Sequence, residues 1–96
     1  MDAYKKKKLS DAEKGLLIAA AQQGTFQILS VDQSPGTWVR AGGKDFLDTE
    51  AGDPAVAAKH LEAFGNLCKR GCIVHESGDS FMLTSTGFKR ARQLAA

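Results

Sequence analysis

Four side chains in this sequence have the chemistry of zinc ligands: His60, Cys68, Cys72 and His75. Structural zinc sites use four Cys or His side chains in a tetrahedron, and their cysteines commonly come in pairs two to four residues apart. Cys68 and Cys72 fit that spacing loosely, since three residues separate them. The spacing alone leaves a metal site, a redox pair and ordinary core packing as alternatives.

The surroundings of the two cysteines favour core packing. Cys68 falls on the apolar face of an expected helix, and Cys72 begins a strand directly after the helix stop at Gly71. A buried free cysteine behaves as a small hydrophobic residue. We therefore expect no bound metal, and no disulfide in a reducing compartment.

No other pattern in the sequence points to catalysis. It contains no nucleophile elbow, phosphate-binding loop or metalloprotease histidine pair. The glycines of AGG and GGKD are too few for a nucleotide-binding loop. A chain of 96 residues also has a small core, in which a deep pocket is hard to build. We expect a protein that is not an enzyme, with no cofactor and no small-molecule substrate.

Length and composition indicate a single soluble domain. The 96 residues are 43% hydrophobic and 25% charged, as in ordinary globular proteins. The longest apolar run, Leu16–Ala21, is too short to span a bilayer, and the basic start lacks the apolar core of a signal peptide. We therefore expect a cytoplasmic protein without membrane contact.

The net charge of +2 is unevenly distributed. Four consecutive lysines, Lys5–Lys8, stand against Asp2 alone in residues 1–8, which we expect to form a flexible basic tail. Residues 9–96 are then close to neutral and form the folded domain.

The first half of the domain is expected to form a helix and a hairpin. Ser10 and Glu13 make a capping box at the start of the helix, and Gly24 ends it. Residues 25–29 alternate in polarity, and residues 37–41 form a second strand after the Pro35–Gly36 turn. The acidic, glycine-rich stretch that follows is expected to be a connection, with a short helical turn near residues 44–47 left open.

The second half is expected to form a helix, a hairpin and a last helix. Asp53 and Pro54 are suited to a helix start, and Gly71 ends a helix over 54–70 in a Schellman motif that brings Cys72 against Leu67. Residues 73–84 form two strands around an SGDS turn, and Thr84 or Ser85 caps the last helix. The expected order is α-β-β-α-β-β-α, which belongs to the α+β class.

The stretch from His60 to Ala91 resembles the C-terminal half of a winged helix-turn-helix domain. In that family a helix with spaced leucines ends at Arg-Gly, an apolar strand leads to a short wing, a second strand ends in Leu-Thr, and a glycine soon after opens a closing helix. The matching residues are Leu61, Phe64, Leu67, Arg70, Gly71, Ile73, Val74, Gly78, Phe81, Leu83, Thr84 and Gly87.

The first half departs from this family pattern, because a hairpin stands where the family has its second helix. Residues 30–46 are similar to a segment of small winged-helix-like domains appended to larger bacterial proteins. The resemblance therefore implies a winged-helix-like domain over residues 9–96, either free or as an accessory part of a larger protein.

The resemblance also implies a way to bind DNA, with the helix 54–70 in the major groove and the wing 73–84 on the backbone. Carried over by position, the contacts would be Lys59, His60, Asn66, Lys69 and Arg70, and the last helix could add Lys89, Arg90 and Arg92. Phosphate binding needs basic side chains. The wing instead carries Glu76 and Asp79 and no Lys or Arg.

Trp38, Val39 and Arg40 form a candidate protein interface, because Trp and Arg are enriched at binding hot spots. Covering the core is the alternative role of Trp38. The hairpin edges could also pair with a second copy to give a homodimer. A near-neutral domain suits a protein partner better than a duplex. We therefore expect a module for protein interaction or self-association, with a DNA-binding regulator as the alternative.

Overall fold

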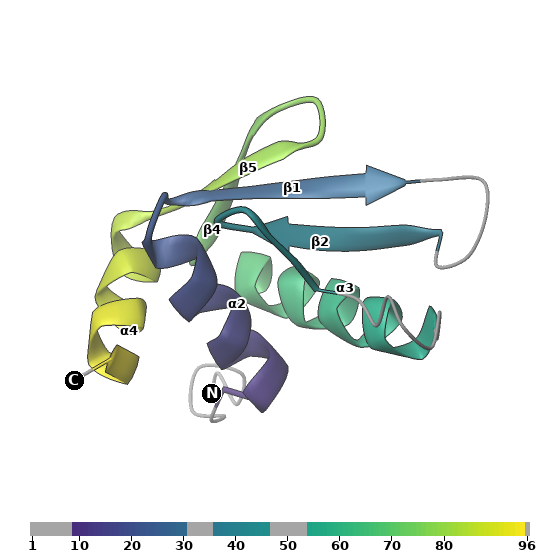
Figure 1. Cartoon of the computed structure of the whole chain (residues 1–96). Coiled ribbons are helices and arrows are strands. Elements are labelled where there is room, and N and C mark those ends of the chain that lie inside the picture. The colour runs from purple at the N-terminus through teal and green to yellow at the C-terminus, as the bar shows by residue number, and fades with distance from the viewer. Residues whose placement is uncertain (1–8, 31–35, 47–53, 96) are drawn as a thin grey trace.

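The computed structural model describes residues 9–30, 36–46 and 54–95. In these ranges the helices and strands are arranged as two layers, a sheet on one side and three helices on the other (Figure 1). The helices are α2 (Asp11–Ala21), α3 (Pro54–Lys69) and α4 (Ser85–Ala95), and the strands are β1 (Thr25–Ser30), β2 (Thr37–Ala41), β3 (Lys44–Phe46), β4 (Ile73–Ser77) and β5 (Ser80–Leu83). The α+β class is confirmed. The expected basic tail, the Pro35 turn position and the Asp53 cap lie outside the described residues.

Strand β3 is the element that the expected order lacks. Gly42 and Gly43 have φ of 58° and 87°, a left-handed conformation that glycine adopts without strain. They turn the chain back on itself, so that Lys44–Phe46 pairs with β2 and Asp45 lies opposite Arg40. A two-residue Gly-Gly loop is a hairpin signal. The short helical turn that the sequence allows near residues 44–47 does not form over residues 44–46, which are a strand instead.

The sheet has the order β3-β2-β1-β5-β4, and every neighbouring pair is antiparallel. The two expected strand pairs are confirmed as β1–β2 and β4–β5. Pairing of β1 with β5, in which Phe26 lies opposite Phe81, joins the two halves of the chain into one sheet.

The ends of α2 and α3 follow from local sequence. At the start of α2, the Glu13 amide donates to Ser10 Oγ (3.2 Å), and the Ser10 amide donates to Glu13 Oε1 (3.1 Å), which completes the predicted capping box. At the end of α3, Gly71 has φ of 78°, and the Cys72 amide donates to the Leu67 carbonyl (3.0 Å). This is the predicted Schellman motif.

The core lies between the helices and the inner face of the sheet. Its most completely buried large side chains come from all parts of the chain: Leu16, Leu17, Phe26, Val39, Leu67 and Cys72. The Phe64 ring packs edge-on against Phe26 and Phe81, with ring centroids 5.5 and 4.9 Å away. The expected packing role of Cys72 is confirmed, and Cys68 is half-buried against the same cluster.

Thr84 caps the start of helix α4 and also ties it to the end of α3. The Thr84 hydroxyl accepts a hydrogen bond from the Gly87 amide (3.1 Å) and donates one to the Gly71 carbonyl (2.6 Å). Gly87 lies directly against the Cys72 backbone carbonyl, so there is no room for a side chain at this position. The glycine in the first turn of α4 is therefore needed for close packing of α4 on Cys72, which joins α3 to β4.

Gly87→Ala is expected to lower the free energy of unfolding by about 2–3 kcal/mol, because the added methyl overpacks a backbone contact. Gly65→Ala is the matched control, since Gly65 lies inside α3 and an added methyl meets nothing within 4 Å. This control is expected to be neutral or to stabilise by up to about 1 kcal/mol. Urea denaturation measures both values, and equal effects would contradict the packing described here.

Candidate interaction surfaces

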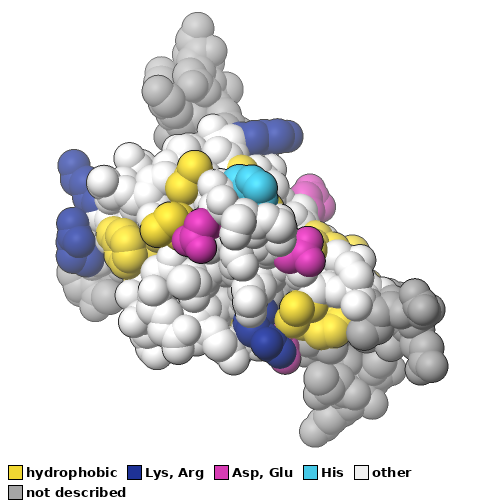
Figure 2. Space-filling view, turned by 90° about the horizontal axis from the view of Figure 1, so that it is seen from above, with side chains coloured by type: hydrophobic (Ala, Val, Ile, Leu, Met, Phe, Trp, Pro, Cys, Tyr) yellow, Lys and Arg dark blue, Asp and Glu magenta, His cyan; other side chains and the backbone are white. Residues whose placement is uncertain are grey.

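The sheet has one face that no described helix covers. Side chains alternate between the two faces of a strand, and α2, α3 and α4 all lie under the inner face (Figure 1). The opposite side, here called the outer face, is the one seen from above in Figure 2. By register it carries Thr25, Gln27, Leu29, Trp38, Arg40, Asp45, Val74, Ser80 and Met82.

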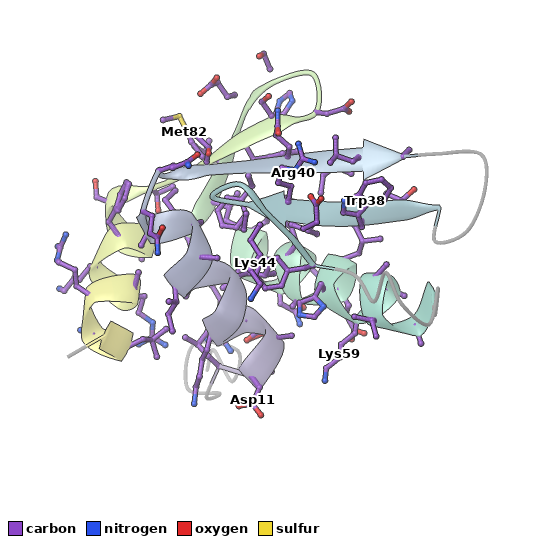
Figure 3. All side chains as sticks on the ribbon, viewed as in Figure 1. Asp11, Trp38, Arg40, Lys44, Lys59 and Met82 are labelled. Atoms are coloured by element: carbon purple, nitrogen blue, oxygen red, sulfur yellow. The ribbon has the colours of Figure 1, made fainter. Side chains whose placement is uncertain are left out.

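Two apolar patches lie on the outer face. Leu29 and Trp38 are cross-strand partners on β1 and β2 and form the Trp38 patch. Val74 and Met82 are partners on β4 and β5 and form the Met82 patch. Val74 is 48% and Met82 40% exposed, and Met82 projects from the sheet away from the helices (Figure 3). In Figure 2 the hydrophobic side chains of this face accordingly fall into separate groups.

A polar row separates the two patches. In it Arg40 Nε donates to Asp45 Oδ1 (2.6 Å) and Arg40 Nη2 donates to Asp45 Oδ2 (3.2 Å), a two-point ion pair across β2 and β3. The Arg40 hydrogen bond holds the pKa of the Asp45 carboxyl below its ordinary value, against a smaller opposing effect of desolvation. The buried indole N–H of Trp38 also lowers this pKa, although its geometry falls short of a standard hydrogen bond.

The structure divides the predicted protein-interface residues between two faces. Trp38 and Arg40 lie on the outer face, half-buried. Val39 points the other way, is 0% exposed and belongs to the core, so it does not belong to this surface. Sequence reasoning missed the contributions of Leu29 and Val74, although the alternation of the strands turns them to the face opposite the buried Phe26 and Ile73.

Two of the predicted nucleic-acid contacts point into the helix layer instead. Asn66 Nδ2 donates to Glu13 Oε2 (3.3 Å), and Arg70 Nε lies 3.7 Å from Glu13 Oε1. The Arg70 and Glu13 side chains are only 7% and 4% exposed. The carboxylate that caps α2 therefore also binds side chains at the end of α3. These are two of the candidate contacts of the DNA-binding alternative.

The remaining candidates on α3 do not form one basic surface. His60 Nδ1 is 2.9 Å from the Val56 carbonyl oxygen, and its ring packs on Phe46 at 4.9 Å between centroids. Lys59 and Lys69 are exposed, with the exposed Glu62 on the same helix between them. Lys59 projects away from the sheet (Figure 3).

On α4, Lys89 and Arg92 are exposed, whereas Arg90 is half-buried. Arg90 lines a depression together with Arg70, Cys72 and Thr86. The structure thus brings Arg70 and Arg90 to one depression.

The cysteines and histidines do not form a metal site in the part of the chain that the structure describes, where no group of three or more His, Cys, Asp or Glu side chains converges. Both thiols are free, and burial raises the pKa of each. For Cys72 the neighbouring guanidinium groups of Arg90 and Arg70 partly offset this increase in pKa. Neither thiol is activated toward nucleophilic chemistry at neutral pH.

None of the helices within the described ranges combines the length and the hydrophobicity needed to cross a lipid bilayer. Comparison of the chain with protein-family models, with curated proteins and with solved structures found no significant match.

Glu13→Ala is expected to lower the free energy of unfolding by about 3 kcal/mol, because it leaves the buried Arg70 guanidinium without its carboxylate and removes a cap. Glu62→Ala, an exposed change of the same kind on α3, is expected to stay within about 0.5 kcal/mol. The double variant Glu13→Ala/Arg70→Met should recover part of the lost free energy of unfolding, as measured by urea denaturation. No recovery would show that the ion pair is not the cause.

The Asp45 carboxyl is expected to titrate below an ordinary aspartate in NMR pH titration, and Arg40→Gln is expected to raise its pKa toward the ordinary range. Because the folded-state pKa is depressed, the pair stabilises the fold above the unfolded-state pKa, and this contribution disappears as pH falls through the folded-state value. An Asp45 pKa that is unchanged by Arg40→Gln would contradict the two-point ion pair.

Proposed function

We propose that this domain is a non-catalytic, winged-helix-like recognition module that associates with a second copy of itself through the outer face of its sheet. The observation that carries the proposal is the composition of that face. An antiparallel sheet often leaves one face in water, but such a face is ordinarily polar. Here it presents two apolar patches with Trp38 in one and the exposed Val74 and Met82 in the other.

The arrangement of the outer face is self-complementary. The Trp38 patch lies on β1 and β2 toward one end of the strands, and the Met82 patch lies on β5 and β4 toward the other. The cross-strand pair Gln27 and Ser80 stands midway between them. Two copies can therefore face each other about a twofold axis that lies between their outer faces and passes over this pair. The Trp38 patch of each copy then lies over the Met82 patch of the other. Such symmetry is the usual arrangement of homodimers.

The winged-helix part of the proposal is supported by the second half of the chain. Helix α3 ends at Arg70-Gly71, the β4–β5 ribbon follows, and α4 packs closely through Gly87. These are the features on which the resemblance is based, whereas the β1–β2–β3 meander replaces the second helix of that family.

DNA binding is the alternative function, and the charge distribution gives it less support. The wing presents Glu76 and Asp79, and Asn66 and Arg70 are bound to Glu13. A duplex surface requires several basic side chains on one side. On α3 the exposed Glu62 instead stands between the exposed Lys59 and Lys69 along the helix.

Sedimentation equilibrium over a range of concentrations tests the proposal. We expect a reversible dimer, and Val74→Lys or Met82→Lys is expected to weaken it at least about 10-fold, since the new charge is buried twice in a symmetric interface. Ile18→Lys is the matched control, because Ile18 is 46% exposed but lies on α2 in the helix layer. A monomer at all concentrations, or equal effects of the three changes, would reject this interface.

Binding of a generic duplex at several salt concentrations tests the alternative. The intact chain, a chain without residues 1–8 and the Lys59→Gln variant are compared by fluorescence anisotropy. We expect little binding once residues 1–8 are removed. Salt-dependent binding that persists without them and is lost in Lys59→Gln would favour DNA recognition by α3 over the proposed function.

A further inference from the structure

A second candidate site lies in the helix layer, away from the outer face. Helices α2 and α4 run in opposite directions, so the start of α2 lies beside the end of α4 (Figure 1). Between them is a groove of about 230 Å³, here called the α2–α4 groove, which is lined by Leu9, Lys14, Arg90, Gln93 and Leu94. Because this volume is below that of sites for drug-sized ligands, the groove suits a small molecule rather than a protein segment.

One end of the groove is apolar. Leu9 directly precedes the Ser10 cap of α2 and is 9% exposed, and Leu94 lies in the last turn of α4 and packs against the core cluster. Both leucines line the groove. Their side chains offer no hydrogen-bonding group, so this end of the groove favours an aliphatic group that leaves water.

The other end of the groove is basic. Lys14 lies about one turn beyond Leu9 on α2, and Arg90 lies about one turn before Leu94 on α4. Because the two helices are antiparallel, these steps lead in the same direction, and the two cations share one end of the groove. Within residues 9–30, 36–46 and 54–95, no carboxylate forms an ion pair with either cation.

Arg90 is the better positioned of the two cations, since it is half-buried whereas Lys14 is exposed. Partial burial reduces the side-chain entropy that is lost when a ligand binds. Cys72 lies on the other side of Arg90 and does not compete as an anion, because burial raises the pKa of its thiol and keeps it protonated at neutral pH. Gln93 adds a side-chain amide that can donate a hydrogen bond beside Arg90.

We propose that the α2–α4 groove binds a short aliphatic carboxylate, with the carboxylate at Lys14 and Arg90 and the hydrocarbon chain between Leu9 and Leu94. The ligand class follows from the order of the lining groups, since a carboxylate accepts charge-assisted hydrogen bonds and its chain covers the leucines. An inorganic anion would leave the apolar end unused, and an alcohol would leave the cations unused. The groove shares no residue with the outer face, so the site does not depend on self-association.

Titration of the intact chain with sodium hexanoate, followed by NMR at constant ionic strength set with NaCl, tests this site. We expect saturable shifts of the Leu9 and Leu94 methyls and of the Arg90 Nε–H, with a dissociation constant on the order of 1 mM. Acetate keeps the charge without the chain, and 1-hexanol keeps the chain without the charge. Each is expected to bind at least about 10-fold more weakly than hexanoate.

Variants with matched controls test the basic end. Arg90→Gln and Lys14→Gln are each expected to weaken hexanoate binding at least about 5-fold. Arg92→Gln and Lys89→Gln are the controls, since they remove the same charges from exposed positions of α4. Lys14 is exposed, so its replacement leaves the fold intact even if Arg90→Gln does not, and the spectra report folding in each case.

Four results would overturn the site. They are equal weakening by the variants and their controls, shifts that do not saturate or that miss Leu9 and Leu94, acetate binding as tight as hexanoate binding, and hexanol binding as tight as hexanoate binding. The first and third would show general charge attraction, and the fourth would show nonspecific apolar contact.

Discussion

The placement of all three described helices on one face of the sheet is the constraint on which the rest of the structure depends (Figure 1). Each strand sends alternate side chains to opposite faces, so covering one face separates the inward side chains of the strands from the outward ones. Phe26, Val39 and Leu83 are thereby placed in the core. Trp38 and Met82 are placed outside, where they form the surface to which we assign self-association.

Glu13 determines how the helix layer holds together. One carboxylate caps α2, accepts a hydrogen bond from Asn66 and pairs with Arg70, so it joins the first and the middle helix. A buried carboxylate is tolerated only when it is paired and hydrogen-bonded in this way. In consequence, the Asn66 and Arg70 side chains are turned toward Glu13 in the helix layer. Arg70 becomes a fixed wall of the depression beside α4 instead of a side chain free to reach a groove of DNA.

Much of the fold could be predicted from local signals with a clear physical cause. The Ser10–Glu13 box, the Gly71 ending of α3 and a cap of α4 at Thr84 or Ser85 each depend on a few adjacent residues. The structure has the first two and selects Thr84 for the third. Strand β3 was missed because its Gly42–Gly43 turn is set in an acidic stretch that reads as a connection. The candidate sites were less predictable, since Glu13, Asn66 and Arg70 meet only through the packing of α2 on α3. Val39 departs from the predicted interface because neighbouring residues of a strand point to opposite faces, which turns it into the core between Trp38 and Arg40.

The most direct measurement of the central claim is the accessibility of methyl groups to a soluble paramagnetic probe, recorded by NMR at low and high protein concentration. The account predicts that Val74 and Met82 methyls are strongly relaxed when dilute and protected when concentrated. Val39 and Leu67 methyls are expected to stay protected throughout, and the Ile18 methyls to stay accessible. Val74 and Met82 methyls that are already shielded in dilute solution, or that stay accessible at every concentration, would contradict an uncovered sheet face that pairs with its own copy.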